Sequence, residues 1–371
     1  MKRLSTSVAV ASALLMSAAP VAFAQEDSEL DIGRFVIAGY GDVSYIAQDD
    51  MNTNVVSRFV PIFLFQLSEK IHIESELEFS IDENGETEIE MEYADMHYFL
   101  NDNTTITAGK FLLPFGQFGP NLHPSWINKL PSMPGVYGHH GSSSLASLLP
   151  ILSDTGINIR NSFNVGSGKL FTDFYVVSGP REEEADEHDE EPVEGEEVHA
   201  EEFPEVEFES AKGDNNDDRA FGGRVAYAFL PQWEVGYSFY QGAYNHDGDL
   251  DFSASSIDFN WNGTFSSVRG EIINTITEGF HEDGDIEEFD RNGWYVQGNW
   301  QMRQLGNDML NPFELVLRRS EITKNNSGER WTFGVNYWLE SSSVLKLAYE
   351  DTKLEDGDTD NRLFIQLAFG F

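Results

Sequence analysis

The sequence contains no cysteine, and it has only 23 lysines and arginines against 64 aspartates and glutamates. Without cysteine, the fold cannot depend on disulfide bonds, which an exported protein could otherwise form. The formal net charge of -41 excludes binding to nucleic acid or to an anionic surface through bulk charge. We therefore expect no nucleic-acid partner, and the sequence indicates no cofactor.

Long apolar runs are also scarce. Near the N-terminus, Lys2 and Arg3 precede an apolar stretch from Val8 to Ala19, and Ala22-Phe23-Ala24 follows. This order is typical of a secretory signal peptide, so we predict a signal at residues 1–24 and one domain at residues 25–371. No other segment has 18 consecutive apolar residues, the length that indicates a membrane-spanning helix. An exported chain of this kind is expected to be either soluble or a β-barrel.

The last ten residues alternate strictly in character. Phe371, Phe369, Leu367, Ile365 and Leu363 are large and apolar, whereas most residues between them are small or polar. A period of two predicts a strand with one apolar face, and a soluble β-sandwich could end in such a strand. An aromatic-rich last strand that ends in phenylalanine also resembles the closing strand of bacterial outer-membrane barrels. That resemblance implies that Phe371 belongs to a signal read by the barrel assembly machinery.

The same alternation predicts sixteen strands. They lie at residues 34–47, 55–67, 71–81, 88–100, 104–113, 154–165, 169–178, 219–230, 232–244, 251–261, 264–277, 291–303, 312–323, 330–339, 343–354 and 360–371.

The length of the link after each strand depends on whether the strand has an odd or an even number. Even-numbered strands are followed by short links, except at residues 304–311, and the long links at residues 114–153, 179–218 and 278–290 follow odd-numbered strands. Short turns at one end and long loops at the other are typical of outer-membrane barrels, and a soluble sandwich has no reason to sort its loops in this way. We predict an all-β fold: a sixteen-stranded antiparallel transmembrane β-barrel with long extracellular loops and short periplasmic turns.

Alternation also predicts which side chains face the lumen, which should hold water in a barrel of this size. The parity changes between Tyr93 and Met96, which indicates a β-bulge. The acidic residues predicted to line the pore are Glu74, Glu76, Glu78, Glu88, Glu90 and Glu92. The basic residues predicted to line it are Arg34, Arg224, Arg269, Arg318, Lys346 and Arg362, with Arg291 as a neighbour of Arg34. An acidic wall opposite a basic wall would give a weak ionic preference that salt screens, whereas ordinary wall salt bridges would not.

Residues 114–153 form the third long loop and are rich in proline, glycine and aromatics. The barrel plan resembles that of sixteen-stranded porins, and the resemblance implies that this loop folds inward and narrows the pore. The alternative is a loop that packs outside the barrel or covers a trimer axis. The residues expected in the constriction are Phe115, Gln117, His123, Trp126, His139 and His140.

The stretch Gly109-Lys110-Phe111-Leu112-Leu113-Pro114-Phe115-Gly116 is similar to a turn of phosphate-selective porins and of legiobactin-type, TonB-independent siderophore porins. Phosphate selectivity implies a ladder of lumen arginines and lysines, which a chain with 23 basic residues does not favour. The siderophore resemblance implies a ferric chelate as an alternative solute.

Residues 179–218 are dominated by glutamate and aspartate. Such a run predicts a solvated, disordered extracellular loop. The alternative is weak capture of metal cations by its carboxylates together with His188 and His199, although no ligand spacing there is regular.

These observations predict a passive outer-membrane channel of a Gram-negative bacterium for small hydrophilic solutes and ions. Uptake of a ferric chelate is the first alternative. A barrel enzyme that uses His97, His123, Ser125 or His246 is the second, but no nucleophile–base signature is present, so we predict no enzyme. The expected partners are outer-membrane lipids, the assembly machinery and the solute, and the resemblance to porins implies a homotrimer.

Overall fold

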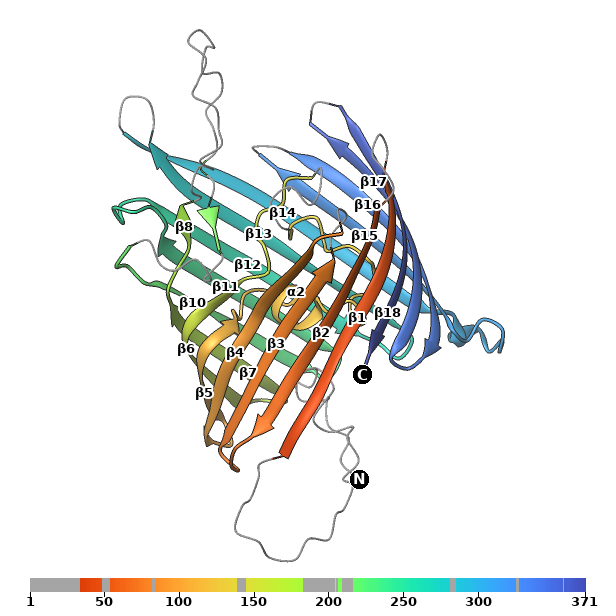
Figure 1. The fold of residues 1–371 in the computed structure, drawn as a ribbon, viewed down its shortest axis with the longest axis horizontal. Helices are drawn as coiled ribbons and strands as arrows, with labels where there is room; N and C mark the ends of the chain where they lie inside the picture. The colour runs from red at the N-terminus through yellow and green to blue at the C-terminus, as the bar shows by residue number, and fades with distance from the viewer. Residues whose placement is uncertain are drawn as a thin grey trace, which may run out of the picture.

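The computed structural model describes residues 34–48, 54–81, 85–138, 145–182, 204, 206–208, 216–280, 285–324, 327–355 and 357–371. Sixteen strands form one closed antiparallel barrel, in which every strand pairs with its sequence neighbours and β1 pairs with β18 (Figure 1). The barrel strands are β1 (Arg34–Gln48), β2 (Asn54–Gln66), β3 (Ile71–Ile81), β4 (Thr87–Asn101), β5 (Thr104–Leu112), β6 (Ser153–Val165), β7 (Gly168–Val177), β10 (Ala220–Leu230), β11 (Trp233–Ala243), β12 (Asp251–Asn262), β13 (Ser266–Phe280), β14 (Ile286–Gln301), β15 (Phe313–Thr323), β16 (Gly328–Glu340), β17 (Ser343–Leu354) and β18 (Thr359–Gly370).

The predicted fold class is confirmed, and each predicted strand matches an observed one within a few residues. The long link predicted at residues 278–290 is wrong. There β13 runs to Phe280 and β14 starts at Ile286, and Glu278 pairs with Glu288 across the ladder. The hairpin keeps its backbone pairing although its side chains become acidic, because backbone hydrogen bonds do not require apolar side chains.

The seam between β1 and β18 closes the barrel. The register runs from Tyr40 opposite Gly370 to Gln48 opposite Arg362. Directly after β18, Phe371 exchanges backbone hydrogen bonds of 2.9 and 3.0 Å with Gly39. Its ring stacks on Phe59 of β2 at a centroid distance of 5.4 Å. Closure leaves no free sheet edge, so backbone groups along every barrel strand can be paired.

Burial alternates along the strands as the sequence predicted. On β18, Leu363, Ile365 and Leu367 point outward and are exposed, whereas Phe364 and Gln366 point inward and are buried. Exposed apolar side chains on the outside of a closed barrel form the band that contacts lipid in outer-membrane proteins. In the described part of the chain, no helix is both long and apolar enough to cross a membrane.

The bulge predicted near Tyr93 is present between β3 and β4. Glu76 pairs with Tyr93 and Leu77 pairs with Met91, so Glu92 is the extra residue of β4. Even-numbered residues of β4 therefore face inward before Glu92, and odd-numbered residues such as Asp95 and His97 face inward after it.

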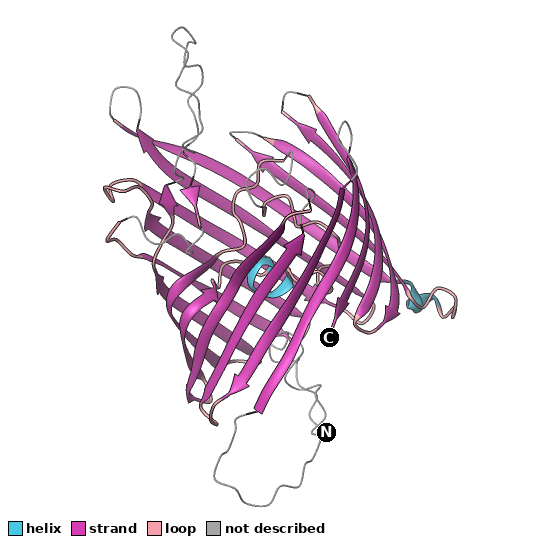
Figure 2. Ribbon diagram, viewed as in Figure 1, coloured by secondary structure: helices cyan, strands magenta, loops and turns pink. Residues whose placement is uncertain are grey.

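The segment between β5 and β6 lies inside the barrel (Figure 2). We call its described residues, 113–138 and 145–152, the inserted loop. It contains the short helix α2 (Phe118–Leu122). Its apolar side chains pack on inward-facing residues of the wall, and this core includes Phe118, Val136, Tyr137, Leu148, Ile273 and Tyr295. Part of the lumen is thus filled with protein rather than water.

A second, two-stranded sheet consists of β8 (Arg181–Glu182) and β9 (Val206–Glu207), and the short 3-10 helix η2 (Met302–Leu305) lies in the link between β14 and β15. The prediction of a solvated, disordered run is therefore wrong for residues 180–181 and 206–208, whereas residues 217–218 are exposed. Val206 is buried, and Phe208 packs on Phe252 edge to face at 5.0 Å. Burial of these apolar side chains stabilises the segment although most of its neighbours in the sequence are acidic.

Candidate functional site in the barrel interior

The inserted loop begins with a tight turn that Glu271 of β13 binds. Its carboxylate accepts hydrogen bonds from the backbone N–H groups of Gln117 at 2.9 Å and Phe118 at 2.7 Å, and from the Tyr137 hydroxyl at 2.5 Å. Gly116 precedes these donors with φ of 61°, and a Cβ there would lie 2.6 Å from Glu271 Oε2. Glycine is required because of both the left-handed backbone and the close approach.

Basic side chains of the later strands bind the rest of the loop. Arg318 donates to the Ser132 carbonyl at 3.0 Å and to its hydroxyl at 2.6 Å. Arg291 donates to the carbonyls of Ala146 and Ser147 at 2.6 and 2.9 Å. Lys346 donates to the carbonyls of Ser125 and Asn128 and to the Gln366 side chain.

Glu350 of β17 is surrounded by three arginines. Its carboxylate lies 2.7 Å from Arg362, 3.5 Å from Arg318 and 3.8 Å from Arg330, and it also accepts a hydrogen bond from the Ser132 hydroxyl at 2.5 Å. The Glu350 side chain is fully buried. This cluster joins the wall to the loop.

The predicted basic residues therefore differ in their surroundings. Arg318 and Lys346 are 0% and 1% exposed because the inserted loop covers them, so the prediction that they line open water is wrong in this structure. Arg224 forms ion pairs with Asp258 at 2.6 Å and Glu234 at 3.1 Å. Arg269 is also buried, whereas Arg362 borders a cavity. Arg34 pairs with Gln66 through its backbone, and its side chain lies outside the described residues.

The separation into an acidic and a basic wall is consequently incomplete. Six buried acidic side chains lie among the basic residues of the later strands: Glu234, Asp258, Glu271, Glu314, Glu350 and Asp360. Alternation placed both signs inward there, and burial under the loop requires each charge to have polar partners.

The acidic residues of β3 and β4 divide into two groups. Glu74 lies 2.6 Å from His97 Nε2, Glu76 accepts from the Tyr40 hydroxyl at 2.9 Å, and Glu78 lies 3.9 Å from Arg58. Glu88, Glu90 and Glu92 form no ion pair with any residue that the structure describes. The first group is partnered, whereas the second forms no ion pair, and its member Glu92 lies near the imidazole of His123.

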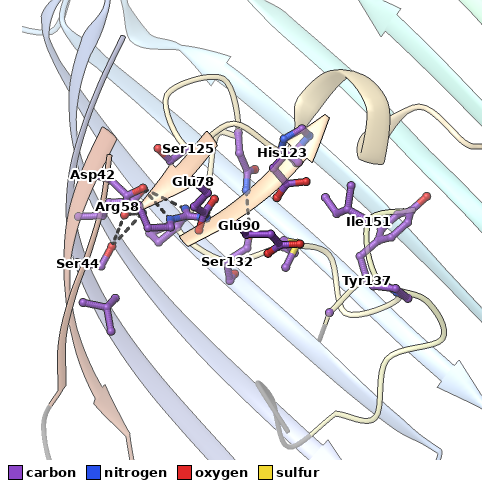
Figure 3. Close-up of a pocket in the computed structure, with 18 of the residues that line it drawn as sticks. Asp42, Ser44, Arg58, Glu78, Glu90, His123, Ser125, Ser132, Tyr137 and Ile151 are labelled. Atoms are coloured by element: carbon purple, nitrogen blue, oxygen red, sulfur yellow. Dashed lines mark hydrogen bonds and ion pairs between the residues drawn. The ribbon is translucent and has the colours of Figure 1, made fainter. Parts of the chain in front are cut away.

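A cavity of about 520 Å³ lies between the inserted loop and the first strands. Figure 3 shows Arg58 beside Asp42 and Glu78 on one side of it, with His123, Ser125 and Ser132 of the loop nearby. The charged side chains that line it are Asp42, Arg58, Glu78, Glu90, Glu92, Lys110, His123, Glu207, Arg330 and Arg362. Asp42 and Arg58 were not among the predicted pore-lining residues, although the same alternation on strands 34–47 and 55–67 places both inward.

The residues expected in the constriction occupy different places. His123 lines the cavity, but Phe115 and Gln117 are buried against the wall. The Trp126 ring lies against Gly370 and packs on the buried cluster of β1 and β2. His139 and His140, like His188 and His199 of the acidic run and the segment 1–24, lie outside the described residues.

Three loop groups have shifted pKa values. Burial opposes the charge of His123, but hydrogen bonding and charge from Glu76, together with Glu92, raise its pKa above the ordinary value. Burial lowers the pKa of Lys129, although Glu314 at 3.4 Å acts in the opposite direction. Burial and Glu271 raise the pKa of Tyr137. The charge of His123 is therefore favoured by two acidic residues, Glu76 of β3 at 4.0 Å and Glu92 of β4.

The fold is that of a porin-type β-barrel. The chain is similar in structure to OmpT of Vibrio cholerae, with a TM-score of 0.55 and 11% identity, covering 93% of this chain and 100% of that one. It is similar to an anion-selective porin from Comamonas acidovorans, with a TM-score of 0.57 and 12% identity, covering 91% of this chain and 100% of that one. It is also similar to Salmonella typhi OmpF, with a TM-score of 0.58 and 10% identity, covering 92% of this chain and 98% of that one. No family model and no curated protein matches the sequence. At these identities the likeness shows the fold alone.

Proposed function

We propose that this protein is an outer-membrane porin that lets small hydrophilic solutes and ions diffuse passively. The observation that carries the proposal is the inserted loop, which lies inside a closed sixteen-stranded barrel and leaves a cavity bordered by charged side chains. A barrel with an apolar exterior suits a lipid bilayer, and a charged interior suits water and ions. The loop, bound to the wall at Glu271, Arg291, Arg318 and Lys346, would set the width of the pore.

The proposed ionic preference is for cations. The carboxylates of Glu88, Glu90 and Glu92, which form no ion pair with any described residue, lie on one wall, whereas most basic groups of the opposite wall bind the loop or buried acids. Free charges attract counter-ions within roughly 8–10 Å at physiological salt, so the acidic side should dominate the field in the water-filled part.

Purified protein in planar lipid bilayers tests the proposal. We expect stepwise insertion of open channels and a zero-current potential in a KCl gradient that shows K⁺ passing more readily than Cl⁻. Liposome swelling with sugars of increasing size would give the size limit. Folded protein that inserts into bilayers but carries no current would rule out the porin function.

The second candidate is uptake of a ferric chelate, which the motif Gly109–Gly116 favours. The motif has a structural role in this chain, because its two glycines have positive φ and it directs β5 into the inserted loop. A deletion strain that fails to grow on a ferric chelate but takes up sugars normally would support specific uptake. Loss of both would favour general diffusion.

We also propose a homotrimer, because one of the similar structures, an in-vitro folded OmpT, is described as a trimer form. Cross-linking of the detergent-solubilised protein should give a trimer band, and a monomer band alone would contradict this assignment.

A further inference from the structure

A cluster of four side chains of metal-binding types lies on the inner face of β3 and β4, close to the short turns at residues 67–70 and 102–103. His72 is paired in register with His97, and Glu74 is paired with Asp95. Directly opposite residues of antiparallel strands point to the same face, so all four side chains meet. One ligand atom from each of Glu74, Asp95 and His97 lies within 4.8 Å of the others.

The His97 Nε2 atom is at the centre of the cluster. It lies 2.6 Å from Glu74 Oε1 and 3.0 Å from Asp95 Oδ1, and His72 Nε2 lies 3.8 Å from Glu74 Oε2. Glu74, Asp95 and His97 thus direct one atom each toward a common point, and His72 lies beside them, next to the second oxygen of Glu74. The cluster is separate from the residues that line the cavity, since none of these four side chains borders it.

Two atoms of the cluster are buried without a hydrogen-bond partner. They are His72 Nε2 and Asp95 Oδ1, on residues that are 7% and 8% exposed. Buried polar atoms in proteins are almost always hydrogen-bonded, and a specific exception calls for an explanation such as an ion. A protonated His97 between the two carboxylates would satisfy Glu74 but would leave His72 Nε2 unbonded.

The other nitrogen of His97 has the partner that a metal ligand needs. His97 Nδ1 lies 2.9 Å from the Thr107 hydroxyl of β5, and Thr107 is buried. When Nδ1 carries the proton and donates it to this hydroxyl, Nε2 has a free lone pair that points at the carboxylates. Histidine ligands of metals are commonly oriented by such an outer hydrogen bond.

We propose that His72, Glu74, Asp95 and His97 form a binding site for a divalent transition-metal ion of the Zn²⁺ class. Two imidazoles with two carboxylates suit Zn²⁺ and its neighbours, whereas Ca²⁺ and Mg²⁺ prefer oxygen ligands alone. Metal–ligand distances of about 2.0–2.1 Å require tetrahedral ligand atoms to be roughly 3.3 Å apart. The observed separations of 2.6 and 3.0 Å around His97 Nε2 are close to this value. His72 Nε2, 3.8 Å from Glu74 Oε2, would turn toward the other three ligands to complete the site.

The experiment is a Zn²⁺ titration of folded full-length protein in detergent, in competition with a zinc-binding chromophore. The parent protein carries His188→Gln and His199→Gln, so that the acidic run contributes no imidazole ligand. We expect one Zn²⁺ per chain, lost in His97→Gln and in Asp95→Asn, and a Co²⁺ form with the strong visible absorption of a tetrahedral nitrogen–oxygen site.

Thr107→Val sharpens the test, because it keeps all four ligands and removes only the outer hydrogen bond. Its affinity for Zn²⁺ should fall about 10- to 100-fold. His246→Gln changes an exposed histidine after β11 and should leave binding unchanged.

Folding of each variant is checked by its heat-dependent shift on gels, and if His97→Gln does not fold, His72→Gln and Thr107→Val replace it. The proposal is overturned if the parent binds no Zn²⁺ or if the folded ligand variants bind it as well as the parent does. Because Zn²⁺ binding is measured without current, this result is independent of channel activity.

Discussion

The two sides of the barrel interior carry charges in different ways. On β3 and β4, Glu88, Glu90 and Glu92 face the interior without an ionic partner. On β10 to β18, Arg224, Arg318 and Lys346 face inward too, but acids or loop carbonyls bind them. Strand alternation puts both sets inward, and the inserted loop decides which of them meets water. Charge counts along the sequence are therefore a poor guide to the field inside the pore.

The largest expected difference between the two sides is in their contribution to stability. The same substitution of glutamate by glutamine, made once on each side, measures it. Glu350→Gln leaves Arg318, Arg330 and Arg362 without their shared carboxylate and should lower the free energy of unfolding by about 3–5 kcal/mol. Glu90→Gln removes a free, exposed carboxylate and should have almost no effect. Urea unfolding in detergent, followed by tryptophan fluorescence, compares the two variants. Equal stabilities would show that the buried cluster is not what holds the later strands and the loop together.

The second difference is in ion selectivity. Glu88→Gln, Glu90→Gln and Glu92→Gln together should bring the K⁺ to Cl⁻ permeability ratio close to one, because these carboxylates form no ion pair. The matched triple variant Glu74→Gln, Glu76→Gln and Glu78→Gln should change the ratio less, since His97, Tyr40 and Arg58 already partner those groups. Zero-current potentials in KCl gradients measure the ratio. The difference should shrink near 1 M salt, where the screening length is about 3 Å, and a larger effect of the partnered triple would contradict this assignment.

The smallest expected effect is a pH dependence from His123, which connects the loop to β3 and β4. Its imidazole donates to the Gly119 carbonyl at 2.6 Å and lies 4.0 Å from Glu76. Because its pKa in the folded protein is raised above 6.5, its stabilising contribution is complete below pH 6.5 and is lost as the pH rises through the folded value. Melting temperatures of the wild type and His123→Gln should differ most at acidic pH and converge at alkaline pH. A difference in melting temperature that does not change with pH would show that His123 stabilises the protein through packing rather than through its charge.

The sequence was sufficient to predict the barrel, because closure, strand number and facing direction all follow from a period-two pattern with short and long links. The bulge near Tyr93 was predictable for the same reason, since it interrupts that pattern. The ends of β13 and β14 were not, because acidic side chains such as Glu278 and Glu288 hide a strand that backbone pairing continues.

The interior was less predictable than the wall. The residues Gly116, Ser132 and Tyr137 belong to an irregular loop, and no periodicity shows that they meet Glu271, Glu350 and Arg318 from strands more than one hundred residues away. Alternation predicts only that a side chain points inward. It does not predict whether water, a loop carbonyl or another charge lies opposite. Loop carbonyls lie opposite Arg318 and Lys346, and for this reason the two side chains are buried.

The single additional residue at Glu92 has a consequence for the whole of β4. It shifts the phase of the strand, so that Glu88 and Glu90 on one side of it and Asp95 and His97 on the other all face the interior. Without that residue, one half of the strand would turn inside out, and carboxylates would replace Ile89 and Met91 against the hydrocarbon. One inserted position thus lets a single strand serve two tasks along its length, with free charge at one end and a convergent cluster of ligands at the other.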